Sequence, residues 1–311
     1  MRVVFLGSGN FAIPSLEALL AAGHDVAAVV TQPDREKGRG RELSPPPVKP
    51  AAAARGLMVL QPRRIREPES VAALEALAPE IQIVVAYGQI LPRRVIDVAP
   101  RGTVNVHASL LPRYRGAAPV QWAIVNGEAE TGVTTMLIDE GLDTGPLLLA
   151  EPTPIGAEET AEALESRLAA MGGELLVRTL KGLQEGAIVP RPQDPARASL
   201  ARLIKKEDGL MDWRLPAPAL ARRVLGFHAW PGAYTHLRGL GLRVLRAQVE
   251  AGEGLEGVPG TLLRIGRDGL VIACGDATAL RLMEVQPESR HPMSAAAFAA
   301  GARLTPGERL G

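Results

Sequence analysis

Apolar residues in the first half of the chain follow two repeating patterns, short continuous runs and longer segments with helical spacing. Residues 2–7 (RVVFLG) form an apolar run that ends in glycine, which is typical of a buried parallel strand. Residues 10–22 carry apolar side chains at the spacing of one helix face, and residues 25–31 are again a short apolar run. Together the three segments predict a strand–helix–strand unit at the start of the chain.

The same alternation continues to about residue 182. Further strands are predicted at 81–87, 102–107, 131–138 and 146–150, and helices at 68–77, 92–98, 117–126 and 157–182. Alternating strands and helices favour an α/β fold with a doubly wound, mostly parallel, Rossmann-like sheet. Ligands of such sheets bind beyond the carboxyl ends of the strands, so the chemistry is expected in the loops that follow them.

The pattern changes after residue 186, where Pro and Arg become frequent and periodicity is lost. One helix is predicted at 215–226, and short strands punctuated by Gly and Pro are predicted at 242–249, 259–265, 269–273 and 278–285. Such a run of strands suggests a small β-barrel or sandwich, and the oligonucleotide-binding (OB) type is one such fold. We therefore predict an α/β domain at 1–186, a linker at 187–206 and a small OB-like domain at 207–311.

Composition narrows the class of protein without identifying it. Apolar residues make up 46% of the 311 residues and charged residues 22%, as in ordinary globular proteins. No apolar run approaches the roughly 20 residues of a membrane helix, and the Gly-rich loop after residue 6 comes too early for a signal peptide. The single cysteine, Cys274, excludes an internal disulfide framework. We expect a cytoplasmic protein with no membrane association.

Charge is distributed unevenly although the net charge is only +1. Residues 1–186 carry 18 Lys/Arg against 22 Asp/Glu, and residues 187–311 carry 17 against 12. Residues 33–49 form a long insertion, and its first part carries Arg35, Lys37, Arg39 and Arg41 with two glycines among them. A basic loop and a basic second half fit a polyanionic partner such as a phosphate backbone, and a solvated surface is the alternative.

The first loop, Gly7-Ser8-Gly9-Asn10-Phe11-Ala12, matches the G-x-G-x-x-A pattern of dinucleotide-binding proteins between a strand and a helix. That use also needs an acid on the ribose near the end of the second strand. The chain has Thr31-Gln32-Pro33 there, and Asp34 comes only after a proline. A tight turn with close packing is therefore favoured over nicotinamide binding.

The strand at 102–107 ends in an amide and an imidazole. Side chains alternate along a strand, so Asn105 and His107 share a face at its carboxyl end. The apolar turn at 109–112 follows and could hold a flat heterocycle. Asp143 lies in a second Gly-rich loop after a strand, where its carboxylate could orient an imidazole and favour its charged form. These three residues are the catalytic candidates.

Neither a metal site nor a nucleophilic triad is predicted. His107 with Asp143 would be too few ligands for zinc, and the remaining histidines are scattered along the chain, at His24, His228, His236 and His291. No G-x-S-x-G elbow occurs, and Cys274 lies outside the α/β part.

Several motifs together resemble one family, the 10-formyltetrahydrofolate-dependent formyltransferases. They are Asn105-x-His107, Ser109-Leu-Leu-Pro-Arg-Tyr-Arg-Gly-Ala-Ala-Pro119, Gly141-Leu-Asp-Thr-Gly145, Thr31-Gln-Pro-Asp-Arg35, Gly38-Arg39-Gly40, Val84-Val-Ala-Tyr-Gly88, Met211-Asp-Trp213 and Trp230-Pro231. The resemblance covers nearly the whole chain. The first loop departs from it, with Ser8-Gly9-Asn10 where a Thr-Pro-Asp-like sequence is expected.

The resemblance implies that the formyl group on N10 of 10-formyltetrahydrofolate moves to the α-amine of methionyl initiator tRNA. Asn105 would donate to the tetrahedral oxyanion, His107 would stabilise it and shuttle a proton, and Asp143 would orient and charge His107. The folate would lie against two segments, Tyr87, Gly88, Gln89 and Ile90, and Ser109, Leu110, Leu111 and Pro112. The basic residues Arg35, Lys37, Arg39 and Arg41, with Arg39 foremost, would enter the tRNA acceptor stem.

Other functions remain open from the residues alone. The same chemistry could act on a sugar nucleotide or glycinamide ribonucleotide, or could hydrolyse the formyl donor, although the basic loop argues against small acceptors. A nicotinamide oxidoreductase and a nucleic-acid-binding protein with an inactive enzyme domain are the alternatives from other classes. We expect a monomer that needs no metal.

Overall fold

The computed structural model describes residues 1–37, 42–252 and 255–311. The chain divides into two compact units, which we describe separately. The first contains residues 1–119, 130–154 and 165–201, and the second contains residues 120–129, 155–164 and 202–311.

The first unit is built on a seven-stranded sheet in the order β10-β9-β7-β6-β1-β2-β5. In that order the bounds are Leu147–Pro154, Glu130–Leu137, Thr103–His107, Ile81–Val85, Arg2–Gly7, Asp25–Val30 and Val59–Leu60. Neighbouring strands from β7 to β5 are parallel, whereas β9 runs antiparallel to both β7 and β10. The predicted mostly parallel α/β sheet is confirmed, with an antiparallel edge.

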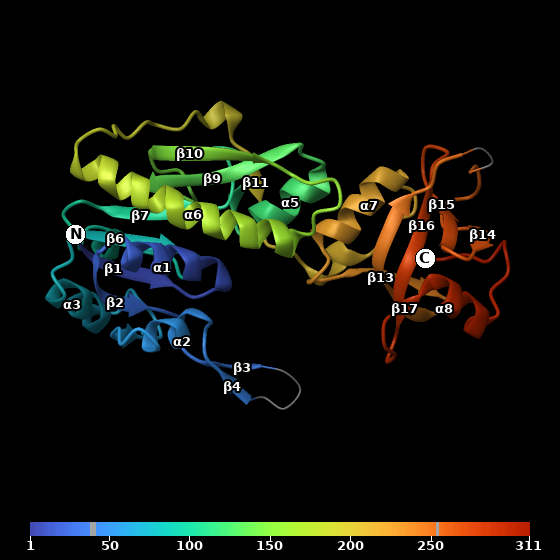
Figure 1. Cartoon of the computed structure of the whole chain (residues 1–311), viewed down its shortest axis with the longest axis horizontal. Coiled ribbons are helices and arrows are strands. Elements are labelled where there is room, and N and C mark those ends of the chain that lie inside the picture. The colour runs from blue at the N-terminus through green and yellow to red at the C-terminus, as the bar shows by residue number, and fades with distance from the viewer. Residues whose placement is uncertain (38–41, 253–254) are drawn as a thin grey trace. The chain divides into compact units, whose positions relative to one another are not determined.

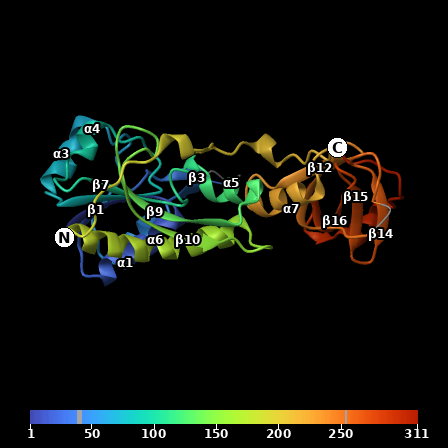
Figure 2. The same cartoon turned by 90° about the horizontal axis from the view of Figure 1, so that it is seen from above.

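Helices cover both faces of this sheet (Figures 1 and 2): α1 and α6 lie on one face, and α3 and α4 on the other. Their bounds are α1 Ile13–Ala21, α3 Pro68–Ala76, α4 Arg93–Ile96 and α6 Ala161–Gln184, and the unit also contains α2 Val48–Ala53. Helix α5 (Pro119–Asn126) falls almost entirely in the second unit. Strands β1 and β6 are buried almost throughout, because both of their faces are covered. This explains why they appear in the sequence as continuous apolar runs.

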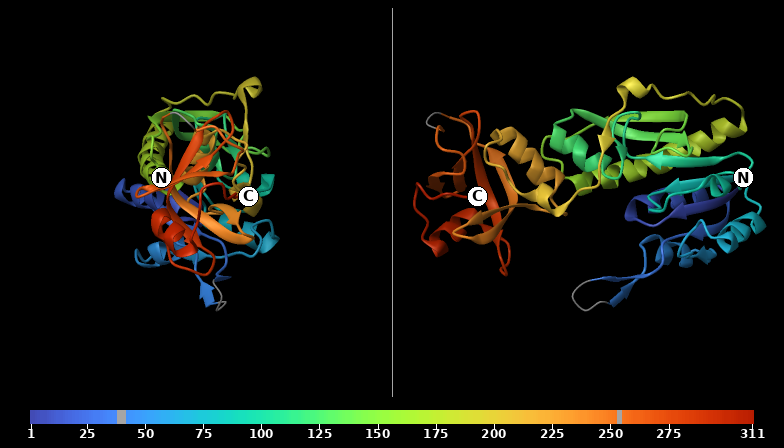
Figure 3. Two further views of the ribbon diagram at one scale, coloured as in Figure 1. Left: turned by 90° about the vertical axis from the view of Figure 1, so that its right-hand side faces the viewer. Right: turned by 180° about the vertical axis from the view of Figure 1, so that it is seen from behind.

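The basic insertion forms a hairpin whose strands β3 (Arg35–Lys37) and β4 (Glu42–Ser44) pair antiparallel. Figure 3 shows the two strands projecting from the α/β unit. The insertion was predicted as a loop without regular structure, and its two short strands and the helix α2 were missed. These elements are short, and Val48 and Ala52 of α2 are buried by tertiary packing that the local pattern does not show.

The second unit contains an antiparallel sheet in the order β12-β13-β16-β15-β14, with β17 paired to β16. The strand bounds are β12 Ala233–Leu237, β13 Leu240–Val249, β14 Leu262–Gly266, β15 Gly269–Ala273, β16 Ala279–Pro287 and β17 Met293–Ser294. Helices α7 (Ala217–Gly226) and α8 (Ala295–Ala302) pack on it and share its hydrophobic core. The predicted antiparallel β domain is confirmed, although β12, β17 and α8 were not predicted.

The last residues of the chain join the two edges of this sheet. Leu310 pairs with Leu237 on β12, and Arg309 pairs with Thr261 just before β14. An exposed strand edge is a template for aggregation, so this terminal segment protects both edges at once.

Among the described residues, no helix has the length and hydropathy needed to cross a membrane.

Candidate active site

The candidate site lies at the carboxyl end of β7. Asn105 is half-buried and pairs in register with Val84 on β6 and Met136 on β9. His107 is two residues further on, and its side chain is only 8% exposed. The alternation of β7 therefore gives the amide and the imidazole the same face, at the edge where ligands of such sheets bind.

His107 is held by a backbone carbonyl. Its Nε2 lies 2.9 Å from the carbonyl oxygen of Tyr114, and since a carbonyl can only accept, Nε2 carries a proton and donates it. The other ring nitrogen, Nδ1, faces the carboxylate of Asp143 with Oδ2 at 3.7 Å. Both nitrogens thus face acceptors, an arrangement that suits a doubly protonated ring. The distance to Asp143 is too long for a direct hydrogen bond.

Asp143 is fixed by two backbone features. Its φ angle is +51°, in the left-handed region that Asp tolerates better than most residues. Its Oδ2 accepts a hydrogen bond of 2.8 Å from the backbone N–H of Gly116. Gly145 is required nearby, because a Cβ there would lie 1.8 Å from the carbonyl oxygen of Leu137.

The loop that starts the Ser109–Pro119 motif is tied to β9. Thr134 Oγ1 donates to the carbonyl oxygen of Ser109 at 2.7 Å and accepts from the backbone N–H of Leu111 at 3.2 Å. Ser109 Oγ donates to the carbonyl oxygen of Arg113, and the Leu111–Pro112 peptide is cis. Ser109 and Leu111 are buried, whereas Leu110 and Pro112 are partly exposed and can meet a ligand.

The segment at 87–90 offers its backbone more than its side chains. Tyr87 is buried in the hydrophobic cluster under the sheet, where burial raises the pKa of its hydroxyl. Gln89 Oε1 accepts from the N–H of Ile65 at 2.8 Å, so this side chain secures a neighbouring loop. Gly88 has a φ of +85°, and Ile90 is 92% exposed.

The base of the basic hairpin is anchored by a polar cluster. Lys49 Nζ bonds both carboxylate oxygens of Asp34 at 2.9 and 2.8 Å, and Gln61 Nε2 donates to Asp34 Oδ1 at 2.7 Å. The bonds from Gln61 and Lys49 lower the pKa of Asp34. Of the predicted nucleic-acid-binding residues, Arg35 is exposed and donates to Gln32, and Lys37 belongs to β3.

Arg39 and Arg41, the other two residues of that prediction, lie outside the described residues.

Sequence reasoning missed the groups that fix the catalytic candidates. Segment 191–201, which we call the strap, was read as linker because it lacks periodicity. In the structure its strand β11 (Leu200–Ala201) pairs with β8 (Arg115–Gly116), and its Gln193 bonds the Asp143 loop. No local signal marks these contacts, because they join residues 48 to 85 positions apart.

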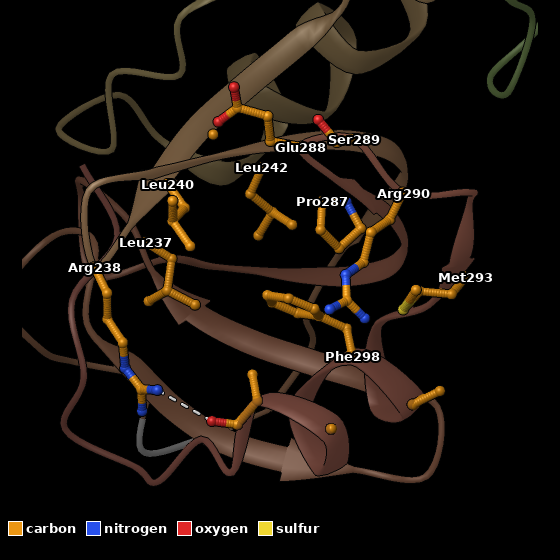
Figure 4. Close-up of a pocket in the computed structure, with 14 residues that line it drawn as sticks. Leu237, Arg238, Leu240, Leu242, Pro287, Glu288, Ser289, Arg290, Met293 and Phe298 are labelled. Carbon is orange, nitrogen blue, oxygen red and sulfur yellow. Dashed lines mark hydrogen bonds between the residues drawn. The ribbon is translucent and has the colours of Figure 1, made fainter.

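A separate cavity of about 650 Å³ lies in the second unit (Figure 4). Apolar side chains such as Leu237, Leu242, Met293 and Phe298 line it, with Arg290 at its side. It contains none of the catalytic candidates, so we do not assign the chemistry to it.

Nowhere in the described part of the chain do three or more His, Cys, Asp or Glu side chains cluster as metal ligands would.

Two family models match the chain, "Formyl transferase" over residues 1–180 and "Formyl transferase, C-terminal domain" over residues 203–303. A methionyl-tRNA formyltransferase of Solibacter usitatus is 54% identical over 312 residues, covering 100% of this chain and 99% of that protein. One from Citrifermentans bemidjiense is 50% identical and covers 100% and 96%.

Among solved structures, HypX from Aquifex aeolicus in complex with tetrahydrofolic acid has a TM-score of 0.62 at 20% identity. The match covers 96% of this chain and 47% of HypX, so the chain spans about half the length of that protein. At this identity the likeness supports the fold alone.

Proposed function

Because this chain belongs to the methionyl-tRNA formyltransferase family, we propose that Asn105, His107 and Asp143 carry its formyl transfer, with 10-formyltetrahydrofolate as donor. The activity itself, formylation of methionyl-tRNA, follows from full-length relatives at about half identity. The observation that carries the residue assignment is the imidazole of His107 set between the Tyr114 carbonyl and the Asp143 carboxylate.

The reaction needs charge stabilisation and one net proton transfer. The α-amine of the methionyl group attacks the formyl carbon, a C–N bond forms, and the carbonyl oxygen becomes an oxyanion. The Asn105 amide donates to that oxygen, and a protonated His107 adds a second donor and a positive charge. The C–N bond to the donor nitrogen then breaks, and the proton lost by the amine ends on that nitrogen.

Of the two ring nitrogens of His107, Nδ1 is the one we assign to the proton transfer. Nε2 is engaged with the Tyr114 carbonyl, whereas the 3.7 Å gap to Asp143 leaves Nδ1 able to exchange its proton with the reacting groups, directly or through one water. Asp143 stays ionised in this scheme and stabilises the charged ring.

The donor's ring system would bind along two loops that flank the site. The segment Tyr87, Gly88, Gln89 and Ile90 would contribute backbone hydrogen bonds from its residues after Tyr87, whose own carbonyl accepts from Ser8 and Gln32. The turn Ser109, Leu110, Leu111 and Pro112 would contribute an apolar wall. Such a mixture of apolar surface and a few fixed polar groups is usual for small-molecule sites. HypX, a relative by fold, is described in complex with tetrahydrofolic acid.

The polyanionic substrate would be held by the basic hairpin and the second unit. Arg35, Lys37, Arg39 and Arg41 supply positive charge in the insertion, and Asp34 with its partners fixes the start of the hairpin strand β3. We propose residues 1–186 as the catalytic part, residues 187–206 as the connection that carries the strap, and residues 207–311 as the tRNA-binding part. We also propose a monomer that needs no metal and works in the cytoplasm, where initiator tRNA is charged.

The test is formyl transfer from 10-formyltetrahydrofolate to charged initiator tRNA, with free methionine and a formyl-accepting sugar nucleotide run alongside. Transfer to the charged tRNA alone is expected. His107→Ala should abolish transfer and leave tRNA affinity within about twofold, whereas His291→Ala, at an exposed histidine, should change neither. Wild-type turnover by His107→Ala would end the catalytic assignment, and transfer to the sugar nucleotide would end the assignment of the acceptor.

A further inference from the structure

The strap is bonded to both loops that hold the catalytic candidates. Ser199 accepts from the backbone N–H of Tyr114 through Oγ at 2.9 Å, and its carbonyl accepts from the N–H of Arg115 at 2.9 Å. Tyr114 is the residue whose carbonyl fixes His107. Arg191 pairs antiparallel with Leu147, just after the Asp143 loop, through two bonds of 2.8 and 2.9 Å.

Gln193 is the strap residue whose side chain joins the two loops. Its Nε2 donates to the carbonyl oxygens of Asp143 and Gly145, both at 2.8 Å. Its Oε1 accepts from Nε and Nη2 of Arg115 at 3.1 and 2.7 Å. Both amide hydrogens and the amide oxygen are therefore used, although the strap residues on either side of Gln193 are exposed.

The position of these bonds matters because Asp143 has a backbone conformation that it would not adopt by itself. A φ of +51° is unfavourable for a residue with a side chain, so contacts around the residue must hold it there. Gln193 holds the carbonyl of Asp143 on one side, and Gly116 holds its carboxylate on the other. Gly116 follows Arg115, whose guanidinium donates a hydrogen bond to Gln193.

We propose that Gln193 is a positioning residue for the transfer reaction. By bonding the backbone carbonyls of residues 143 and 145, Gln193 places the Asp143 carboxylate opposite His107. This inference rests on the proposed roles of Asp143 and His107. The bonds of Gln193 go to backbone carbonyls and to Arg115, and none goes to the Asp143 carboxylate or the His107 ring. Gln193 therefore acts through the backbone of Asp143. The same contacts make the active site complete only when the strap is in place against β8.

The experiment compares the steady-state kinetics of Gln193→Ala and Gln193→Glu in formyl transfer to charged initiator tRNA, with each substrate varied in turn. Glu keeps an acceptor for Arg115 but presents oxygen, not N–H, to the two carbonyls, so it loses the bonds that matter here. Both variants should lower kcat by roughly 10- to 100-fold and leave both KM values within about twofold. Gln184→Ala removes an amide at an exposed position, at the end of α6 in the same unit, and should change nothing.

A background variant separates positioning from a general loss of structure. Asp143→Asn keeps an oxygen for the Gly116 N–H and tolerates the left-handed backbone, but removes the charge. Adding Gln193→Ala to Asp143→Asn should lower kcat by less than about threefold if the two residues act in one chain. Thermal unfolding of each variant is measured, and activity is compared well below the lowest Tm.

Two results would overturn the inference. Full activity of Gln193→Glu beside an impaired Gln193→Ala would show that the Arg115 contact is what matters. Multiplicative effects of Gln193→Ala and Asp143→Asn would show that Gln193 does not act through Asp143. Wild-type activity of Asp143→Asn alone would instead refute the proposed catalytic role of Asp143.

Discussion

Asp143→Asn tests the central claim about the site, that a negative charge beside His107 is needed for transfer. The substitution is nearly isosteric. Asn tolerates the φ of +51° at this position, and its Oδ1 can still accept from the N–H of Gly116. The fold should therefore be preserved, and what the variant removes is the charge 3.7 Å from Nδ1.

The structure bounds the size of the effect. Two unit charges 3.7 Å apart interact by about 4 kcal/mol at an effective dielectric constant of about 20, which suits side chains that are only 8% and 16% exposed. Loss of a preorganised donor to an oxyanion costs about 3–4 kcal/mol in comparable enzymes. Both estimates correspond to a fall in kcat of roughly 100- to 1000-fold.

The assay is steady-state transfer of labelled formyl from 10-formyltetrahydrofolate to charged initiator tRNA, with each substrate varied at a saturating concentration of the other to give kcat and both KM values. KM values within about threefold of wild type, and an unchanged Tm, are expected alongside the slow transfer. A kcat within threefold of wild type would refute the reasoning, because it would show that His107 works without the Asp143 charge. A large loss of Tm would show instead that Asp143 is needed for folding.

Three further outcomes are expected. Replacing Arg39 and Arg41 by Gln should raise the KM for tRNA and reduce the slope of log KM against log salt by about one per residue. The affinity for folate should not change. Unchanged tRNA kinetics would show that this basic segment is a solvated surface with no role in tRNA binding. Gly145→Ala should cost about 3 kcal/mol of unfolding free energy in urea titrations, because its Cβ would meet the Leu137 carbonyl at 1.8 Å; unaltered stability would contradict this. Burial raises the pKa of Cys274 to about 12, so iodoacetamide should label the folded protein far more slowly than the urea-unfolded chain at pH 9, and equal rates would place the thiol at the surface.

The pKa of Cys274 also fixes the sign of a pH effect on stability. In the unfolded chain a cysteine ionises near 8.5, well below the value for the buried thiol. The unfolded state therefore loses its proton first, and the contribution of this group to folding stability declines as pH rises from about 8.5 toward 12. Cys274→Ala should remove that decline, which pH-dependent urea unfolding would measure.

Much of the fold was predictable because it is encoded locally. The continuous apolar runs of β1 and β6 and the periodic helices between the strands are consequences of burial on both faces of a parallel sheet, so they predicted the α/β class. Short elements were harder. Strands β5, β8 and β11 have two residues each, and their pairing partners rather than their own sequences make them strands.

The sequence by itself determined the chemistry that is present. Because side chains alternate along β7, Asn105 and His107 lie on the same face, and the motif around them identified the family. What only the tertiary structure decided is how those groups are held: the Tyr114 carbonyl on His107, the Gly116 N–H on Asp143, and the Gln193 amide across both loops. The physical reason is that these hydrogen bonds join residues 7, 27 and 50 positions apart, which only the fold brings together. One partner in each bond is a backbone group that nearly every residue carries, so the sequence alone does not reveal the pair.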